Sequence, residues 1–207
     1  MIDTDELIPS HEEPFRSVLI FGPPGSGKGT QGKFLSSAGN HFHLSSGDIF
    51  RGLSPESAAG KLFHKYASRG HLLPDEVTSK IWHHFVHGLI STNRYFPKEQ
   101  LLLLDGIPRT KGQAEHLDQF LKVERIILLE SKDPEVFIQR LLRRGMIERR
   151  LDDKDRDVLR TRMEVYEKET KEVLSCYPQA IVSRFNADQR PLEVLRDILL
   201  DLSDLLS

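Results

Sequence analysis

One short segment limits both the fold and the chemistry of this chain, the run Gly-Pro-Pro-Gly-Ser-Gly-Lys-Gly-Thr from Gly22 to Thr30. The apolar run before it, Ser17 to Phe21, favours a buried strand, and the proline-free stretch from Lys28 to Ser37 favours a helix. Glycines let backbone N–H groups turn toward phosphate oxygens, the start of a helix adds partial positive charge, and Lys28 adds an ammonium group. The segment therefore predicts a phosphate-binding loop rather than an ordinary turn rich in glycine and proline.

Composition and charge exclude several classes of protein. The 207 residues include 29 Lys and Arg against 31 Asp and Glu, so the chain lacks the positive excess typical of nucleic-acid binding, and we expect no nucleic-acid partner. The single cysteine, Cys176, excludes a disulfide framework and a four-cysteine zinc site, and we interpret it as a buried or unreactive thiol. No apolar run approaches the ~20 residues of a membrane span, and the acidic start is unlike a signal peptide. These features predict a cytoplasmic protein that binds no membrane.

Short apolar runs alternate with helical patterns along the chain. Such alternation predicts an α/β fold, a P-loop parallel five-stranded sheet with helices on both faces. We expect the strands at residues 17–21, 42–45, 101–105, 125–130 and 180–185. One helix is expected to begin after Asp133 and to end just before Gly145, and two others to occupy about residues 153–177 and 191–206.

The chain is predicted to form one domain with two excursions. Residues 1–16 lack apolar periodicity and are expected to be a flexible leader before a single domain over residues 17–207. Within that domain, residues 45–73 and 144–151 break the alternation of strand and helix. We interpret both as lids beside a binding site, the alternative being ordinary loop insertions.

A second group of polar residues follows the apolar run that starts at Leu101. This run ends in Asp105, and a carboxylate there can hold Mg²⁺ through its waters beside a phosphate loop. The residues that follow Asp105, Gly-Ile-Pro-Arg-Thr, present the guanidinium of Arg109 at the carboxyl edge of the sheet. Open parallel sheets bind ligands at that edge, although an ordinary surface arginine is the simpler alternative.

Taken together, these motifs make the chain resemble the adenylate kinase family of nucleoside monophosphate kinases. Four ordered motifs carry the resemblance, which runs from about Ser17 to the C-terminus: Gly22 to Thr30 with Gln31, Ser46 to Arg51, Asp105 to Thr110 with Gln113, and the series Arg140, Arg144, Arg150 to Asp153 and Arg162. The resemblance implies reversible transfer of the terminal phosphoryl group of MgATP to AMP, which gives two ADP. It also implies a helical monophosphate-binding insertion over residues 45–73, a short lid without zinc and a monomeric chain.

The family's roles carry over to the residues that match its motifs. The implied catalytic residues are Lys28, Arg109, Arg144, Arg150 and Arg162. ATP would contact Gly25, Ser26, Gly27, Lys28, Gly29, Thr30, Arg140, Arg144 and Arg190. AMP would contact Ser46, Arg51, His71, Leu72, Leu73, Gly106, Ile107, Pro108, Arg109, Gln113, Arg150 and Arg162. Asp152 and Asp153 would position the lid, while Asp48 and Asp105 would hold Mg²⁺ through water, with no metal bound directly by the protein.

Gln113 favours AMP as the acceptor, because a glutamine amide can donate to and accept from an adenine edge, whereas related uridylate and cytidylate kinases carry asparagine there. A UMP/CMP-type kinase stays open as the alternative. Three departures from the family pattern also leave open a nucleotide-binding protein without turnover: Ile107 replaces an aromatic residue, Arg149 replaces a glycine, and the stretch from Asp153 to Arg162 is one residue longer. A GTP-driven switch is disfavoured, because the chain has no Asn-Lys-x-Asp run.

Overall fold

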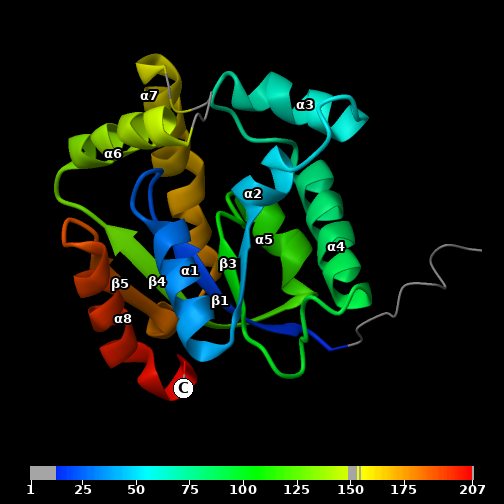
Figure 1. Cartoon of the computed structure of the whole chain (residues 1–207), viewed down its shortest axis with the longest axis vertical. Coiled ribbons are helices and arrows are strands. Elements are labelled where there is room, and N and C mark those ends of the chain that lie inside the picture. Colours follow the sequence, from blue (N-terminus) through cyan, green and yellow to red (C-terminus); the bar gives the residue numbers. More distant parts are fainter. Residues whose placement is uncertain (1–12, 149–152, 154, 207) are drawn as a thin grey trace, which may run out of the picture.

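The computed structural model describes residues 13–148, 153 and 155–206 of the chain. Within them, five strands form one sheet in the order β2-β3-β1-β4-β5, and each pair of neighbouring strands is parallel (Figure 1). The strands are β1 (Phe15–Phe21), β2 (Phe42–Ser45), β3 (Leu102–Asp105), β4 (Leu121–Glu130) and β5 (Val182–Asn186). The predicted parallel five-stranded sheet is confirmed.

Helices connect the strands and cover both faces of the sheet, as predicted. They are α1 (Lys28–Gly39), α2 (Ser46–Arg51), α3 (Ala58–Ala67), α4 (Asp75–Ser91), α5 (Lys111–Asp118), α6 (Pro134–Ile147), α7 (Arg156–Val165) and α8 (Pro191–Leu206), with the π-helix η3 (Tyr166–Thr170) and the 3-10 helices η4 (Lys171–Cys176) and η5 (Gln179–Ile181). Successive side chains of β1 divide between two cores. Leu19 packs in one core with Trp82 of α4, and Ile20 packs in the other with Leu35 of α1 and Ile198 of α8.

Strands β1 and β4 both begin earlier than the sequence predicts. Phe15 pairs with Leu121 at the start of the two strands, and Phe15 is only 2% exposed, so it belongs to the sheet and not to a flexible leader. Beside this pair, Arg16 Nε donates to Glu124 Oε1 over 2.7 Å on the solvent side. Charged residues alternate with apolar ones here, which conceals the strand from a search for continuous apolar runs.

Helix α6 begins as predicted but does not end as predicted. The side chain of Asp133 caps its start by accepting a hydrogen bond from the Glu135 N–H over 3.0 Å. The helix then continues two residues beyond Gly145, so the expected stop at this glycine was wrong. A Cβ on Gly145 would lie 2.7 Å from the backbone oxygen of Asp153. The glycine therefore allows two chain segments to approach closely, and it does not end the helix.

The helix expected over residues 153–177 is present as a continuous helical run from Arg156 to Cys176 whose hydrogen-bond pattern changes along its length. Helix α7 passes directly into the π-helix η3 and then into the 3-10 helix η4. Tyr166 and Val173 are buried along this run. Cys176, at its end, is exposed and not buried.

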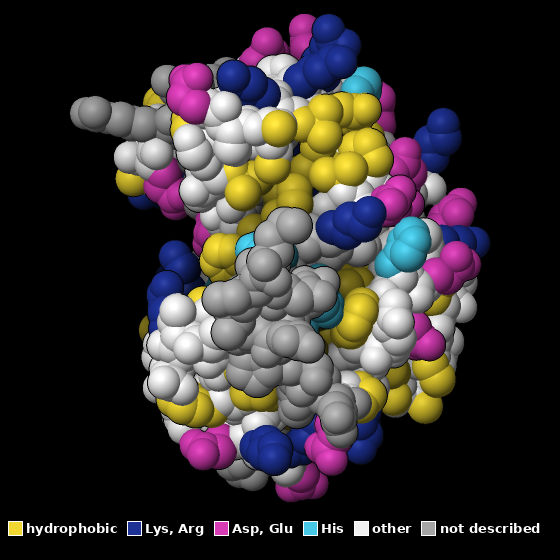
Figure 2. Space-filling model, turned by 90° about the vertical axis from the view of Figure 1, so that its right-hand side faces the viewer, with side chains coloured by type: hydrophobic (Ala, Val, Ile, Leu, Met, Phe, Trp, Pro, Cys, Tyr) yellow, Lys and Arg dark blue, Asp and Glu magenta, His cyan; other side chains and the backbone are white. Residues whose placement is uncertain are grey.

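Two helical groups stand above the carboxyl ends of the strands, α2 and α3 on one side and α6 and α7 on the other (Figure 1). The first group lies within the predicted excursion at residues 45–73, where the ring of Phe50 stacks on that of Phe63 with centroids 5.8 Å apart. Hydrophobic side chains gather in the upper part of the molecule on this side (Figure 2). Residues 149–151 of the second predicted excursion lie outside the described residues. No helix in the described part of the chain is both long and apolar enough to cross a membrane.

Candidate active site

A cavity of about 360 Å³ opens at the carboxyl edge of the sheet. Its walls come from the loop after β1, from α2, α3 and the loop that follows them, from the end of β3, and from α6, α7 and η3. Because all five strands are parallel, their carboxyl ends meet at this one edge, where open α/β sheets bind ligands. Segments that are far apart in the sequence therefore contribute side chains to one space.

The loop from Gly22 to Thr30 forms the wall at the start of α1. It turns tightly, with the Ser26 N–H donating to the Pro23 carbonyl over 3.1 Å. Gly25 has a φ of +84°, and a Cβ there would lie 2.5 Å from the backbone oxygen of Phe137, so no other residue fits without displacement of the backbone. The unpaired N–H groups of the first turn of α1, with their partial positive charge, can therefore serve an anion in the cavity.

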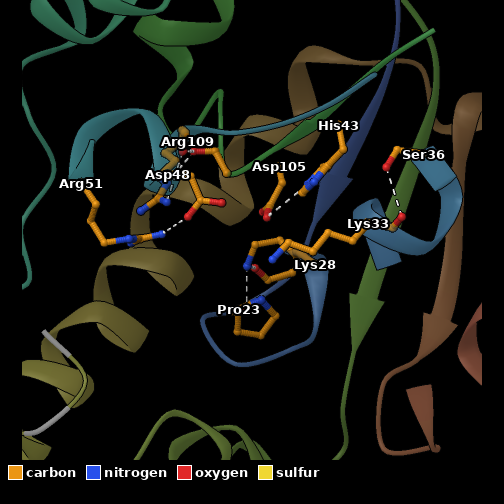
Figure 3. Close-up of polar contacts among 12 residues, drawn as sticks. Pro23, Lys28, Lys33, Ser36, His43, Asp48, Arg51, Asp105 and Arg109 are labelled. Carbon is orange, nitrogen blue, oxygen red and sulfur yellow. Dashed lines mark hydrogen bonds and ion pairs between the residues drawn. The ribbon is translucent and has the colours of Figure 1, made fainter. Parts of the chain in front are cut away.

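Lys28 places its ammonium group on the same wall (Figure 3). Its Nζ donates to the carbonyls of Gly22 over 2.7 Å and Pro23 over 3.0 Å. Burial lowers the pKa of this ammonium to about 8, and the nearby guanidinium groups also lower it, while the Asp105 carboxylate opposes the shift. A cation held among other cations favours the arrival of an anion, since the anion would offset both the burial and the repulsion.

Asp105 ends β3 beside this loop and is also buried. Burial by itself would raise the pKa of its carboxyl group, but His43 and the Lys28 ammonium hold that pKa below its usual value. The His43 Nε2 atom lies 3.8 Å from Asp105 Oδ2 (Figure 3). No local sequence pattern points to His43, because its position beside Asp105 depends on β2 being the neighbour of β3.

Two arginines face the cavity from α2 and from the loop after β3 (Figure 3). Arg51 Nη2 donates to Asp48 Oδ1 over 2.7 Å, which ties the last residue of α2 to a residue of its first turn. Arg109 Nε donates to the Gly106 carbonyl over 2.6 Å, and the Ser46 hydroxyl donates to the same carbonyl over 2.6 Å. These contacts fix the guanidinium of Arg109 next to the start of α2.

Two further arginines converge on one buried carboxylate. Arg144 Nε donates to Asp153 Oδ2 over 2.6 Å, and Arg162 Nη1 donates to Asp153 Oδ1 over 2.6 Å. Asp153 is completely buried, while the side chains of Arg144 and Arg162 are 30% and 17% exposed. Burial by itself would raise the pKa of the Asp153 carboxyl group, but the hydrogen bonds and charges of the two arginines hold it below its usual value. Asp153 thus positions one arginine from α6 and one from α7.

The cavity brings together most of the residues predicted from the sequence. It is lined by Gly25, Gly27, Lys28, Gly29, Thr30, Ser46, Asp48, Arg51, His71, Leu72, Leu73, Asp105, Gly106, Ile107, Pro108, Arg109, Gln113, Arg144 and Arg162. Ser26, Arg140 and Arg190 do not line it, and Arg140 Nη1 instead donates to the Ala187 carbonyl over 2.8 Å. Arg150 and Asp152 lie outside the described residues.

Several lining residues were not predicted. Phe34, Phe50, Phe63, Thr78, Tyr166 and Thr170 give the cavity apolar and hydroxyl surfaces. Phe50 lies within the motif from Ser46 to Arg51, where no role was assigned to it, and the others lie outside the motifs, so that only the packing of their helices brings them to the site. Within the described residues, no group of three His, Cys, Asp or Glu side chains is placed to bind a metal ion directly.

Comparison with known proteins identifies the family of this chain. A protein-family model described as "Adenylate kinase" matches residues 20–182. The chain belongs to the adenylate kinase family. The resemblance inferred from the sequence motifs is thereby confirmed.

Individual relatives cover most of the chain. The adenylate kinase of Flavobacterium psychrophilum is 40% identical over 167 residues, which span 78% of this chain and 84% of the relative. The adenylate kinase of Flavobacterium johnsoniae is 39% identical over 167 residues, which also span 78% of this chain and 84% of the relative. That of a Synechococcus species is 34% identical over 189 residues, which span 88% of this chain and 93% of the relative. Similarity to adenylate kinases therefore extends well beyond the phosphate loop.

Proposed function

We propose that this adenylate kinase family member transfers the terminal phosphoryl group of MgATP to AMP and gives two ADP. The observation that carries the proposal is the convergence of Lys28 with four arginines of the described residues, Arg51, Arg109, Arg144 and Arg162, on one cavity. Guanidinium groups bind phosphate in a bidentate manner, and a set of them drawn from separate elements suits a reaction that brings two phosphate chains together.

The ATP phosphates would lie along the wall formed by the loop from Gly22 to Thr30. Backbone N–H groups at the start of α1 would bind the phosphate oxygens, and Lys28 would place its ammonium on the terminal phosphates. Arg140 and Arg190 would border the adenine only if they move, since neither lines the cavity.

AMP would lie on the other side of the cavity, with its phosphate between Arg51 and Arg109. Its base would contact Gln113, Ser46 and the loop from His71 to Leu73, which all line the cavity. Ile107 packs into the core at 2% exposure while it also lines the cavity, so it offers the base an aliphatic contact in place of an aromatic one.

The reaction needs no side chain to act as a base. The attacking oxygen belongs to a phosphate that is mostly ionised at neutral pH, since its second pKa is about 6. Positioning and charge stabilisation therefore carry the catalysis. Arg144 and Arg162 would neutralise charge on the transferring group, held in place by Asp153.

The acidic residues of the site fit the Mg²⁺ that accompanies ATP. Asp105 is a carboxylate that reaches the loop, with its Oδ2 atom 3.3 Å from where a Cβ on Gly29 would lie. Mg²⁺ prefers oxygen ligands and keeps several waters, which Asp105 and Asp48 would hold by hydrogen bonds. Bound Mg²⁺ would supply neutralisation of phosphate charge.

An acceptor assay tests the proposal. ADP formation from MgATP is measured with AMP, CMP, UMP and GMP in turn, and we expect AMP to have the highest kcat/KM. A preference for CMP or UMP would identify a UMP/CMP-type kinase instead. Binding of MgATP with no transfer to any monophosphate would identify a nucleotide-binding protein without turnover.

The lowered pKa of Lys28 leads to a pH prediction. The ammonium is charged below a pKa of about 8 and neutral above it, so the free enzyme loses this cation as the pH rises. The value of kcat/KM for MgATP should be level near pH 7 and should fall above about pH 8, approaching tenfold per pH unit. Bound phosphates raise the pKa of the lysine, so kcat should fall later. Initial rates between pH 6 and 9.5 check this, and a kcat/KM that stays level to pH 9.5 would contradict it.

A further inference from the structure

The side chain of Gln113 is held between a donor and an acceptor. Its Oε1 atom accepts a hydrogen bond from the Arg109 backbone N–H over 2.8 Å. Its Nε2 atom donates to Asp75 Oδ1 over 3.0 Å. Gln113 is only 2% exposed, so few other arrangements are open to it. The backbone N–H cannot accept and a carboxylate cannot donate, so the two contacts together allow only one orientation of the amide.

Asp75 is itself held in place. It is the first residue of α4, and its Oδ1 atom also accepts a hydrogen bond from the Thr110 hydroxyl over 2.7 Å. That hydroxyl in turn accepts from the Gln113 backbone N–H over 3.1 Å, which caps α5. The other oxygen of Asp75 lies against Gly112, where an added Cβ would be 2.4 Å from Oδ2. The carboxylate is thus fastened to the first turn of the helix that carries Gln113.

The fixed amide has chemical consequences for the cavity that Gln113 lines. An amide oxygen accepts two hydrogen bonds and an amide nitrogen donates two, so after the contacts to Arg109 and Asp75 one acceptor and one donor site remain. The Watson–Crick edge of a 6-aminopurine offers a donor at the amino group and an acceptor at N1. A 6-oxopurine offers the reverse, an acceptor at O6 and a donor at N1. Only the edge of the 6-aminopurine matches an amide that is held in this one orientation.

We propose that Asp75 is a positioning residue that fixes the Gln113 amide, and that it thereby makes the acceptor site select 6-aminopurine over 6-oxopurine monophosphates. This inference rests on the proposed function, in which Gln113 faces the base of the acceptor. It assigns to Asp75 a role in base selection without contact between Asp75 and the substrate.

The test compares kcat/KM for AMP with that for IMP, which differs from AMP only at the 6-position and N1, with MgATP as donor. In Asp75→Ala the acceptor of the Nε2 hydrogen bond is gone, so the amide is held only at Oε1, by the Arg109 N–H, and its NH₂ group can turn away from the adenine edge. The AMP to IMP ratio should fall about 20-fold, mainly through a higher KM for AMP. In Asp75→Asn the ratio should stay within about threefold of wild type, because the amide oxygen can still accept from Gln113 and Thr110.

Glu76→Ala is the matched control. Glu76 is the next acidic residue of α4, its side chain is 72% exposed, and it accepts a hydrogen bond from the exposed Lys80 over 2.8 Å, so the ratio should not change. A general loss of structure at Asp75 would lower both kcat/KM values together and leave their ratio intact. An unchanged ratio in Asp75→Ala would overturn the inference.

If Asp75→Ala does not fold, Asp75→Ser repeats the test. A serine suits a helix start, but its hydroxyl is too short to reach Gln113, so the same fall in the ratio is expected. The two proposals fail in different ways. A wild-type protein that transfers phosphoryl to no monophosphate contradicts the proposed function, whereas active wild type with an unchanged ratio in the variants contradicts only the role of Asp75.

Discussion

Replacement of Lys28 by methionine should lower kcat for ADP formation about 1,000-fold, which corresponds to about 4 kcal/mol of transition-state stabilisation. Methionine keeps an unbranched stem but removes the ammonium that would bridge the phosphates. The loss should appear mainly in kcat, because charge develops on the transferring group in the transition state. Initial-rate measurements with saturating MgATP and AMP check this.

Two measurements make the Lys28 result specific. Thermal unfolding of Lys28→Met shows whether the chain still folds, since Lys28 also donates to the Gly22 and Pro23 carbonyls. Lys80→Met is the control, because Lys80 is an exposed lysine of α4 whose loss should leave the rate unchanged. A Lys28→Met protein that keeps more than a tenth of the wild-type rate would contradict the proposed site.

Replacement of Asp153 by asparagine should cost about 3 kcal/mol of stability, because it leaves two arginines around a group that can no longer accept from both. The carboxylate is fully buried and accepts from Arg144 and Arg162 over 2.6 Å each. An asparagine of the same size presents an NH₂ group to one of them. The rate should also fall, by about 100-fold, since both arginines lose their common support. Urea unfolding and kcat for ADP formation measure the two effects.

The matched control for this variant is Asp157→Asn. Asp157 pairs with Arg160 in the same helix over 3.2 Å, but its side chain is 89% exposed. Exposed pairs contribute little, so this variant should change stability by less than about 0.5 kcal/mol. If Asp153→Asn is as stable as Asp157→Asn, the buried carboxylate does not hold the two arginines.

The contribution of Asp153 should depend on pH. Burial opposes ionisation, but Arg144 and Arg162 outweigh it and lower the pKa of this carboxyl group in the folded protein. Because the pKa of this carboxyl group is lower in the folded protein than in the unfolded chain, its ionised form stabilises the folded protein at any pH above the unfolded pKa of about 4. This stability is lost as the pH falls through the pKa of the folded protein. The difference in unfolding free energy between wild type and Asp153→Asn should therefore stay constant from pH 8 to 5 and shrink below about pH 4.

Local sequence patterns predicted the phosphate loop and the motif after β3 correctly in position. Both are runs of adjacent residues that follow an apolar strand, so each is specified by residues that are close together in the chain. The fold class follows from the same signals, because the alternation of strand and helix admits few other arrangements. The starts of β1 and β4 were missed, since Arg16 and Glu124 interrupt the apolar pattern there and pair with each other across the strands.

The sequence by itself determined the loop from Gly22 to Thr30, the alternation of strands and helices, and the family. The tertiary structure decided which side chains meet. His43 lies beside Asp105 because β2 neighbours β3. Asp75 holds Gln113 because α4 packs on α5. Gly145 allows the backbone of α6 to approach that of Asp153 closely. The reason is physical. A local pattern depends on residues a few positions apart, whereas strand order and helix packing depend on burial of apolar surface across the whole chain.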